Sequence, residues 1–219
     1  MRYCLLFVLP TLLLFVFACG DGLEQREETD ALGFRTVYQI DPATGQREGM
    51  MRMYDPQGNL ASEEHYAAGK LEGKRRIYAP GGVVIVEENY KADAFDGPFA
   101  TFDSTGTPAS RGQYVDGKMA KAWFYYYPNG QVKEVVTFAD NAENGPFREW
   151  YADGTPRASG SYANGDNEQG ILHLYAENGQ LERVMDCNAG VCATFWTPDS
   201  TAAAPAGPDM TAPPRAGSR

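Results

Sequence analysis

The stretch Ala122–Gln131, with the sequence AWFYYYPNGQ, is the clearest copy of a unit that this chain repeats. In each copy the first residue is followed five positions later by an aromatic residue and nine positions later by a glycine. The repeats are spaced 24 residues apart, with one step of 25. They begin at Gly49, Gly73, Gly97, Lys121, Gly145 and Gly170, so that Lys121 replaces a glycine. Six copies in register identify a repeat protein.

Further positions of the unit recur as well, counted here as offsets from the first residue of each repeat. Offset five is aromatic in every copy: Tyr54, Tyr78, Phe102, Tyr126, Trp150 and Tyr175. Offset nine is glycine in every copy: Gly58, Gly82, Gly106, Gly130, Gly154 and Gly179. Offset seventeen is aromatic in five copies and Cys187 in the last, and offset twenty is Gly, Asp or Asn, residues that tolerate positive φ.

Each unit has the pattern of a β-hairpin. Offsets one to six predict a first strand, followed by turn sequences such as Tyr127-Pro128-Asn129-Gly130 and Ala152-Asp153-Gly154. Offsets eleven to seventeen predict a second strand, and a second turn near offset twenty leads into the next unit. The sequence therefore predicts an all-β fold, an elongated single-layer antiparallel sheet built from about six 24-residue β-hairpin repeats.

Alternation along the strands predicts which side chains share a face of this sheet. In the fourth repeat, offsets 11, 13, 15 and 17 hold Val132, Glu134, Val136 and Phe138, which we expect on one face. In the first strand, offsets two and four are mostly apolar. The aromatic residue at offset five should then point to the opposite face, unless a bulge intervenes.

The chain begins with the features of an export signal, which we assign to residues 1–19. Arg2 precedes an apolar run from Leu5 to Ala18, short for a membrane-spanning helix but typical of a signal-peptide core. The run ends in Val16-Phe17-Ala18-Cys19-Gly20, which resembles the lipobox of bacterial lipoproteins, although Phe17 is bulkier than usual there. The resemblance implies that Cys19 is acylated and anchors the exported protein to a bacterial membrane, the outer membrane being the expected one. An ordinary cleaved signal and an uncleaved anchor are the alternatives.

Composition predicts the borders of the folded part. Residues 20–33 are acidic and poor in large apolar side chains, so we expect a flexible tether. The repeat array should cover residues 34–196, with the half-unit 34–48 as a cap that protects the first edge of the sheet. Residues 197–219 are rich in Ala and Pro, which predicts a disordered tail.

Two cysteines remain in the exported part. Cys187 ends the last repeat, and Cys192 follows the turn Asn188-Ala189-Gly190. In an oxidising compartment we expect a disulfide that closes this hairpin, the alternative being two reduced, partly buried thiols. No metal site is expected, because this pair supplies too few ligands and no histidine is near.

The repeated Gly-x-x-x-x-Tyr-x-x-x-Gly unit resembles the MORN-repeat variant of bacterial proteins. Gly73 to Gly82, Gly145 to Gly154 and the Tyr-Pro-Asn-Gly turn of the fourth repeat match it best, and Lys121 and Cys187 depart from it. The resemblance implies an extended, single-layer sheet of hairpins and no catalytic residues. Many exported or lipidated members of that group are labelled antitoxin components of toxin–antitoxin systems.

Composition and motifs predict a protein that is not an enzyme and has no cofactor. A net charge of −10 and a pI near 4.7 argue against binding to nucleic acid or, without help, to anionic lipid. His65 and His173 lie more than four repeats apart, which disfavours a histidine-centred triad or metal cluster. We expect His173 to be an exposed strand residue.

One stretch has more aromatic residues than a single packed face requires. The candidate partner-binding residues are Trp123, Phe124, Tyr125, Tyr126, Tyr127 and Trp150. Consecutive aromatic residues point to both sides of a strand, and exposed aromatic groups often mark contact sites. Packing of both faces is the alternative explanation.

These features favour a membrane-anchored repeat protein that binds another envelope protein through its broad sheet. Neutralising a toxin, as the label of similar proteins implies, and binding glycan through stacked rings are the alternatives. The sequence leaves the partner, the oligomeric state and the binding face open.

Overall fold

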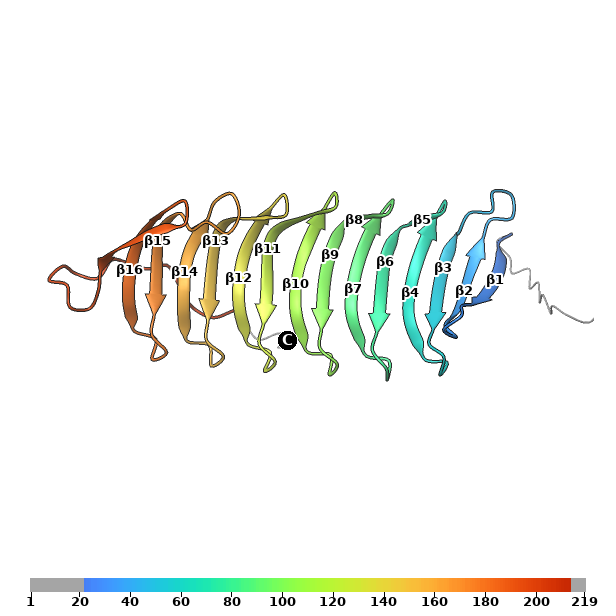
Figure 1. Ribbon diagram of the computed structural model, residues 1–219, viewed down its shortest axis with the longest axis horizontal. Coiled ribbons are helices and arrows are strands. Elements are labelled where there is room, and N and C mark those ends of the chain that lie inside the picture. The colour runs from blue at the N-terminus through green and yellow to red at the C-terminus, as the bar shows by residue number, and fades with distance from the viewer. Residues whose placement is uncertain (1–21, 214–219) are drawn as a thin grey trace, which may run out of the picture.

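The protein is one long row of antiparallel strands, seen in a computed structural model that describes residues 22–213 (Figure 1). The export signal and Cys19 lie outside the described residues. All strands belong to one open 17-stranded sheet. Between residues 22 and 213 there is no helix of the length and apolarity needed to cross a membrane.

The strands follow one another along the sheet in chain order, each antiparallel to the next. Their bounds are β1 Glu24–Thr29, β2 Arg35–Ile40, β3 Gly49–Tyr54, β4 Leu60–Ala67, β5 Lys70–Leu71, β6 Gly73–Tyr78, β7 Val84–Lys91, β8 Ala94–Phe95, β9 Gly97–Phe102, β10 Pro108–Val115, β11 Lys118–Tyr126, β12 Val132–Ala139, β13 Ala142–Trp150, β14 Pro156–Tyr162, β15 Gly170–Tyr175, β16 Leu181–Asn188 and β17 Val191–Trp196. Short β5 and β8 pair with the ends of β4 and β7, just before the first glycine of the next repeat. The predicted all-β sheet of hairpins is confirmed.

Both turns of the unit depend on residues with positive φ. In the fourth repeat the N–H of Gly130 donates to the carbonyl of Tyr127 at 2.9 Å, and Gly130 has a φ of 78°. In the turn between the second and third repeats, Ala92 and Asp93 have φ values of 49° and 72°. Two successive positive φ values are typical of the type I′ turn, whose twist matches that of the flanking strands. Lys121 has a φ of 63°, so this lysine keeps the backbone conformation of the glycines that it replaces.

A β-bulge in the second strand of the hairpins decides which side chains share a face. Tyr125 pairs with Glu134 but Tyr126 pairs with Val132, so Lys133 is an extra residue. Offset five therefore lies opposite to offsets two and four, as predicted. The prediction that Val132 shares a face with Glu134 is wrong, because the extra residue reverses the alternation at that point.

Aromatic rings fill one face of the middle of the array, which we call the ring face. Trp123 lies 5.5 Å from Phe99 and 5.9 Å from Phe138, measured between ring centroids. Phe147 stacks on Tyr162 at 4.3 Å. Trp123 and Phe147 are buried, together with Val136, which has no exposed surface. Fully burying one such side chain stabilises the fold by about 1.5–3 kcal/mol.

The N-terminal segment is a strand, so the expected tether is wrong for most of its length. β1 pairs with β2 along all six of its residues, from Glu24 opposite Ile40 to Thr29 opposite Arg35. Two of its three glutamates have partners on β2: the hydroxyl of Tyr38 donates to Glu28, and Arg35 pairs with Glu27 at 3.2 Å. Charged, exposed side chains suit an edge strand, because its stability comes from backbone hydrogen bonds on one side. Acidic composition was therefore a misleading sign of disorder.

The C-terminal segment also differs from its prediction. Residues 197–213 have little regular structure, yet they return along the sheet from the β16 end toward its middle (Figure 1). The indole N–H of Trp196 donates to the carbonyl of Ala202 at 3.1 Å, and that of Trp150 donates to the carbonyl of Met210 at 2.9 Å. We call residues 202–213 the strap, and the face they cover, opposite to the ring face, the strap face. The strap has one large apolar side chain of its own, that of Met210, but the sheet supplies the rings on which the strap lies.

The predicted disulfide is confirmed. Cys187 and Cys192 face each other across the turn between β16 and β17 and are joined by an S–S bond of 2.05 Å. Cys187 is buried and belongs to the core of the ring face. The bond therefore closes the last hairpin where the aromatic residue of offset seventeen is missing.

Candidate functional site

The aromatic run of the fourth repeat is divided between the two faces of β11. Trp123 is buried in the ring-face core, and Tyr125 packs against that core. Phe124 and Tyr126 alternate with them and lie half-buried on the strap face. Burial raises the pKa of Tyr126, and the nearby Arg111 guanidinium opposes that effect. Trp123 is thus a core residue, whereas Phe124 and Tyr126 are partly accessible on the opposite face.

The six aromatic residues of offset five form a row along the strap face. Five of them are half-buried: Tyr54, Tyr78, Phe102, Tyr126 and Tyr175. Trp150 is 1% exposed, and it is the ring whose indole is bonded to the strap. The hydroxyl of Tyr127, the last candidate of the run, donates to the carbonyl of Trp150 at 3.1 Å. The row is therefore covered at the fifth repeat.

The strap covers the sixth repeat as well. A Cβ added to Gly207 would lie 2.8 Å from the hydroxyl oxygen of Tyr175 and 3.5 Å from the imidazole of His173. His173 is buried, and this burial lowers its pKa, an effect that the backbone of Ala206 opposes. The expectation that His173 is an exposed strand residue is wrong, because the strap lies over it. Val184, which pairs with His173 across the strands, has no exposed surface.

At the N-terminal end of the strap face, which the strap does not reach, the sheet surface carries rows of ion pairs. Arg52 pairs with Glu63 at 2.9 Å, and Glu63 also accepts a hydrogen bond from the hydroxyl of Tyr78 at 2.8 Å. One repeat later, Arg76 pairs with Glu87 at 2.9 Å. The hydrogen bonds from Arg52 and Tyr78 lower the pKa of Glu63. In the first two repeats the strap face is therefore occupied by paired charges of this chain.

A second ion-pair network lies on the ring face of the first two repeats. Arg75 contacts Glu64 at 3.1 Å and Glu88 at 3.2 Å. The two carboxylates also accept hydrogen bonds from the hydroxyls of Tyr66 and Tyr90, at 2.9 and 3.0 Å. The Glu64 and Glu88 side chains are 9% and 11% exposed, so two nearly buried acids share one arginine as their charged partner.

Three further carboxylates gather on the ring face near the middle of the array. Glu134 pairs directly with Glu149 across the strands, and Glu143 lies opposite Phe138. Burial raises the pKa of Glu134 to about 7, and repulsion from Glu149 and Glu143 adds to this effect. Within residues 22–213 no group of three or more His, Cys, Asp or Glu side chains is arranged to hold a metal ion. Through the raised pKa of Glu134, the cluster bears on the stability of the fold.

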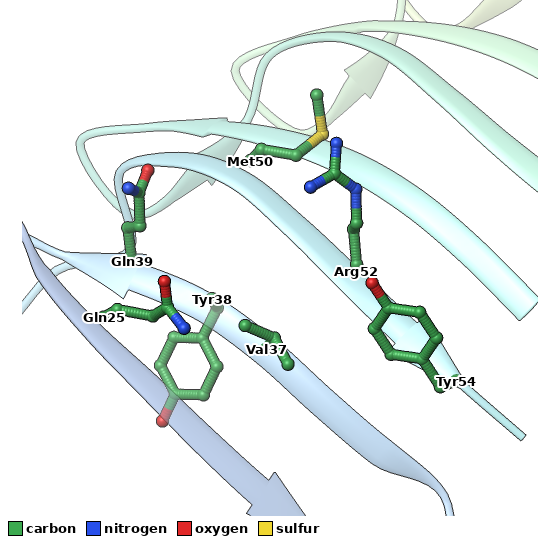
Figure 2. Close-up of a pocket in the computed structure, with 7 residues that line it drawn as sticks. All are labelled: Gln25, Val37, Tyr38, Gln39, Met50, Arg52 and Tyr54. Atoms are coloured by element: carbon green, nitrogen blue, oxygen red, sulfur yellow. The ribbon is translucent and has the colours of Figure 1, made fainter. Parts of the chain in front are cut away.

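A shallow depression on β1, β2 and β3 is the clearest hollow at the N-terminal end (Figure 2). Its lining includes Gln25, Gln39, Met50 and Arg52, with Tyr54 at one end. Arg52 is already paired with Glu63, and the other groups are neutral. The depression offers no combination of nucleophile, base and electrophile for catalysis.

Sequence reasoning found the offset-five row but missed what covers it. The role of Arg75 could not be predicted from a single sequence, because it depends on two glutamates in neighbouring strands. A sign of the strap is present in the sequence: Pro205-Ala206-Gly207-Pro208 has the Pro-x-x-Pro spacing of segments that dock on aromatic side chains.

Three stretches match a known repeat family. Residues 47–68, 71–92 and 121–140 match the MORN repeat variant, and each match falls on one hairpin: β3–β4, β6–β7 and β11–β12. The chain thus carries MORN-variant repeats at these positions, and the remaining hairpins share their turns and spacing. A comparison with curated proteins gave no match. MORN repeats generally serve in binding to proteins or membranes, and their all-β repeat fold is typically not catalytic.

Proposed function

We propose that this protein is a non-enzymatic scaffold of the bacterial envelope, which binds another protein through the strap face of its repeat sheet. The observation that carries the proposal is the offset-five row, in which Phe102 and Tyr126 are half-buried on the strap face beside the strap-covered Trp150. Aromatic side chains at the surface are common anchors of protein interfaces. An open sheet presents such a row as a broad surface, and MORN repeats generally serve in binding.

The proposal includes a lipid anchor on Cys19. The motivation is the sequence Val16-Phe17-Ala18-Cys19-Gly20 after an apolar run. Folded structure begins at Glu24, so only a few residues would separate the sheet from the membrane. Two or more acyl chains hold a protein stably at a membrane. Cys19→Ser should move the protein from the membrane fraction to the soluble fraction, and an unchanged membrane fraction would contradict the anchor.

Capture from envelope extracts tests the binding function. The full chain carries a photo-crosslinker near Tyr126, and crosslinked partners are compared with those of a Phe102→Leu, Tyr126→Leu variant. Leucine keeps apolar bulk but removes the flat ring. Phe195→Ala is the matched control, because Phe195 is an aromatic residue 54% exposed in the last strand.

We expect one defined partner that the control retains and the double variant loses. If all three proteins recover the same set, the strap-face row has no part in binding.

A further inference from the structure

The strap crosses the sheet in step with the repeats. Gly207 lies against Tyr175 of the sixth repeat, and Met210 accepts the hydrogen bond of Trp150 in the fifth repeat. Three residues of the strap thus correspond to one repeat of the sheet. Met210 and Pro213, again three residues apart, are half-buried, as is Ala212, whereas the remaining residues from Gly207 to Thr211 are exposed.

This step matches the geometry of polyproline II. One repeat contributes two strands, so neighbouring rings of the row are separated by about 9.5 Å along the sheet. Polyproline II has three residues per turn and rises about 3.1 Å per residue, or about 9.3 Å per turn. A segment in this conformation therefore places the same side of its backbone over each successive ring.

The composition of the strap fits the same conformation. Pro205 and Pro208 are three residues apart, and Pro213 follows Met210 at the same spacing. The indole N–H of Trp150 donates to a backbone carbonyl, a contact that depends on backbone position rather than on one side chain. Recognition through rings and backbone carbonyls is the usual way in which aromatic surfaces bind proline-rich segments.

The row continues beyond the strap with rings of the same kind. Tyr126 and Phe102, at offset five of the fourth and third repeats, are half-buried, and Phe124 lies beside Tyr126 on the same face. A depression at the third repeat is lined by the apolar residues Pro98, Ala100 and Phe102 and by charged or polar side chains on either side of them, those of Lys74, Glu87, Asn89 and Arg111. The ion pairs of Arg52 and Arg76 mark the end of this apolar stretch.

We infer that the strap face from the third to the sixth repeat is a binding track for proline-rich peptide segments in polyproline II conformation, at three residues per repeat. The strap holds the C-terminal end of the track within the same chain, and a proline-rich segment of a partner protein displaces it. This inference rests on the proposed scaffold function and names the chemistry of its partner. It also gives the strap a role, that of an internal competitor.

The probe is a synthetic peptide with the sequence of residues 202–213, labelled with a fluorophore. A second peptide has the same composition, with its prolines moved to a spacing of four residues. Binding to the full chain is measured by fluorescence anisotropy. The indole N–H resonance of Trp150, identified by substitution, reports whether the strap is displaced.

The strap is loosened in a Pro205→Gly, Pro208→Gly variant, which leaves the sheet unchanged. The peptide can bind only while the strap is detached, so its apparent affinity scales with the fraction of time that the track is free. Loosening the strap raises this fraction, and the first peptide should therefore bind the loosened variant about tenfold more tightly than wild type. The re-spaced peptide should bind about tenfold more weakly than the first, since its contacts fall out of step with the rings. Tyr126→Leu in the loosened background should weaken binding, whereas Phe195→Ala should not.

Equal affinity of the two peptides, or no binding to the loosened variant, overturns the track. Equal affinity of the first peptide for wild type and loosened variant overturns the competition. Thermal unfolding of each variant shows whether a loss of binding reflects a loss of folding. If peptide binding fails while capture from envelope extracts still depends on Tyr126, the scaffold function stands and its partner is not proline-rich. If the peptide binds but no partner is captured, the track stands and the scaffold function fails.

Discussion

The N-terminal half of the sheet, repeats one and two, and the C-terminal half, repeats three to six, fill the same position of the repeat with different side chains. Offsets two and fifteen pair across each hairpin on the ring face. From the first to the sixth repeat the pairs are Met51–Glu64, Arg75–Glu88, Phe99–Gly112, Trp123–Val136, Phe147–Gly160 and Leu172–Met185. The second pair is an ion pair, and the next three place a large ring opposite a small or apolar residue. The backbone lattice is thus independent of how its inner positions are filled.

The difference teaches where each half takes its stability. A buried ring stabilises the folded state in proportion to the apolar area that it removes from water, and this contribution changes little with pH. A buried ion-pair network loses much of its Coulomb energy to desolvation, and it fails when one partner is removed. The N-terminal half should therefore respond most strongly to the loss of a charged partner, and the C-terminal half to changes of side-chain volume.

Removing the central ring tests the C-terminal half most severely. Trp123 is 3% exposed and contacts the rings of Phe99, Tyr114 and Phe138. Trp123→Ala should lower the free energy of unfolding by about 3–5 kcal/mol, through lost burial and the cavity left behind. Urea unfolding followed by far-UV circular dichroism measures the loss. Phe195→Ala, at an exposed ring, should change it by less than about 0.5 kcal/mol. A similar loss for both would contradict a core centred on Trp123.

Removing one cation tests the N-terminal half. Arg75→Ala leaves Glu64 and Glu88 nearly buried without their arginine, which should cost about 2–3 kcal/mol, since Arg75 itself is 30% exposed. Replacing the whole network by Arg75→Met, Glu64→Leu and Glu88→Leu should restore stability close to wild type, because well-packed apolar groups substitute for buried ion pairs. Urea unfolding at neutral pH checks both variants. A triple variant no more stable than Arg75→Ala would show that the network has a role beyond charge compensation.

A small residue beside a large ring is the matching weak point of the C-terminal half. A Cβ added to Gly112 would lie 2.1 Å from the indole of Trp123, so Gly112→Ala must displace the ring. Overpacking of this kind should lower the free energy of unfolding by about 1–3 kcal/mol. Combined with Trp123→Leu, the same substitution should cost measurably less, which a double-mutant cycle detects. Additive effects would mean that the loss from Gly112→Ala does not come from a clash with Trp123.

The sequence alone predicts the hairpins of this fold better than it predicts the details of their strand pairing. The hairpins followed from turn residues, and even Lys121 could be placed, because five glycines mark its position in the other repeats. The bulge could not be predicted: the extra residue is Ala61 in the first repeat and Lys133 in the fourth, which share no chemical property. Because of the bulge, Val132 lies on the strap face and Glu134 on the ring face.

The predictions for residues 20–33 and for the C-terminal tail were wrong for a different reason. Composition measures whether a segment can form a core of its own, but β1 and the strap both bind to an existing sheet. β1 uses backbone pairing with β2, and the strap uses rings supplied by β13 and β15. The aromatic run stands out in the sequence, yet only the strand register shows that Trp123 and Tyr126 face opposite sides.

The pH response should have opposite signs in the two halves. Glu134 has a pKa raised by burial to about 7, so its stabilising effect is present at acid pH and is lost as the pH rises through 7. Glu134→Gln should thus raise the free energy of unfolding at pH 8 by about 1–2 kcal/mol and have little effect at pH 4. The matched control is Glu63→Gln, since hydrogen bonds from Arg52 and Tyr78 lower the pKa of Glu63. Its stabilising effect is present at neutral pH and is lost as the pH falls, so this variant should lose about 0.5–1 kcal/mol at pH 8.

Denaturant unfolding between pH 4 and pH 8 separates the two cases. Effects of the same sign at both positions would contradict the proposed contrast between paired and unpaired carboxylates.

The smallest expected effect concerns the lattice that both halves share. Lys121 has a φ of 63°, where the aligned residues Gly97 and Gly145 also have positive φ. A left-handed conformation costs a residue with a Cβ about 1–2 kcal/mol, and glycine costs about 0.5–1 kcal/mol of chain entropy instead. Lys121→Gly should therefore stabilise the protein by up to about 1 kcal/mol. It also removes the hydrogen bond from the Lys121 ammonium to Gln113, but at an exposed site such a bond adds little.

The control for this substitution is Lys118→Gly, three residues earlier in the same strand. Lys118 has no positive φ and pairs with Asp140 at the surface. Glycine there gains nothing from its backbone freedom and should destabilise by about 0.5–1 kcal/mol. Opposite signs for two lysines of one strand, measured by thermal unfolding, would identify backbone conformation as the cause. If both variants are destabilised alike, the strand relaxes around Lys121, and the glycine of the repeat is kept for a reason other than its φ.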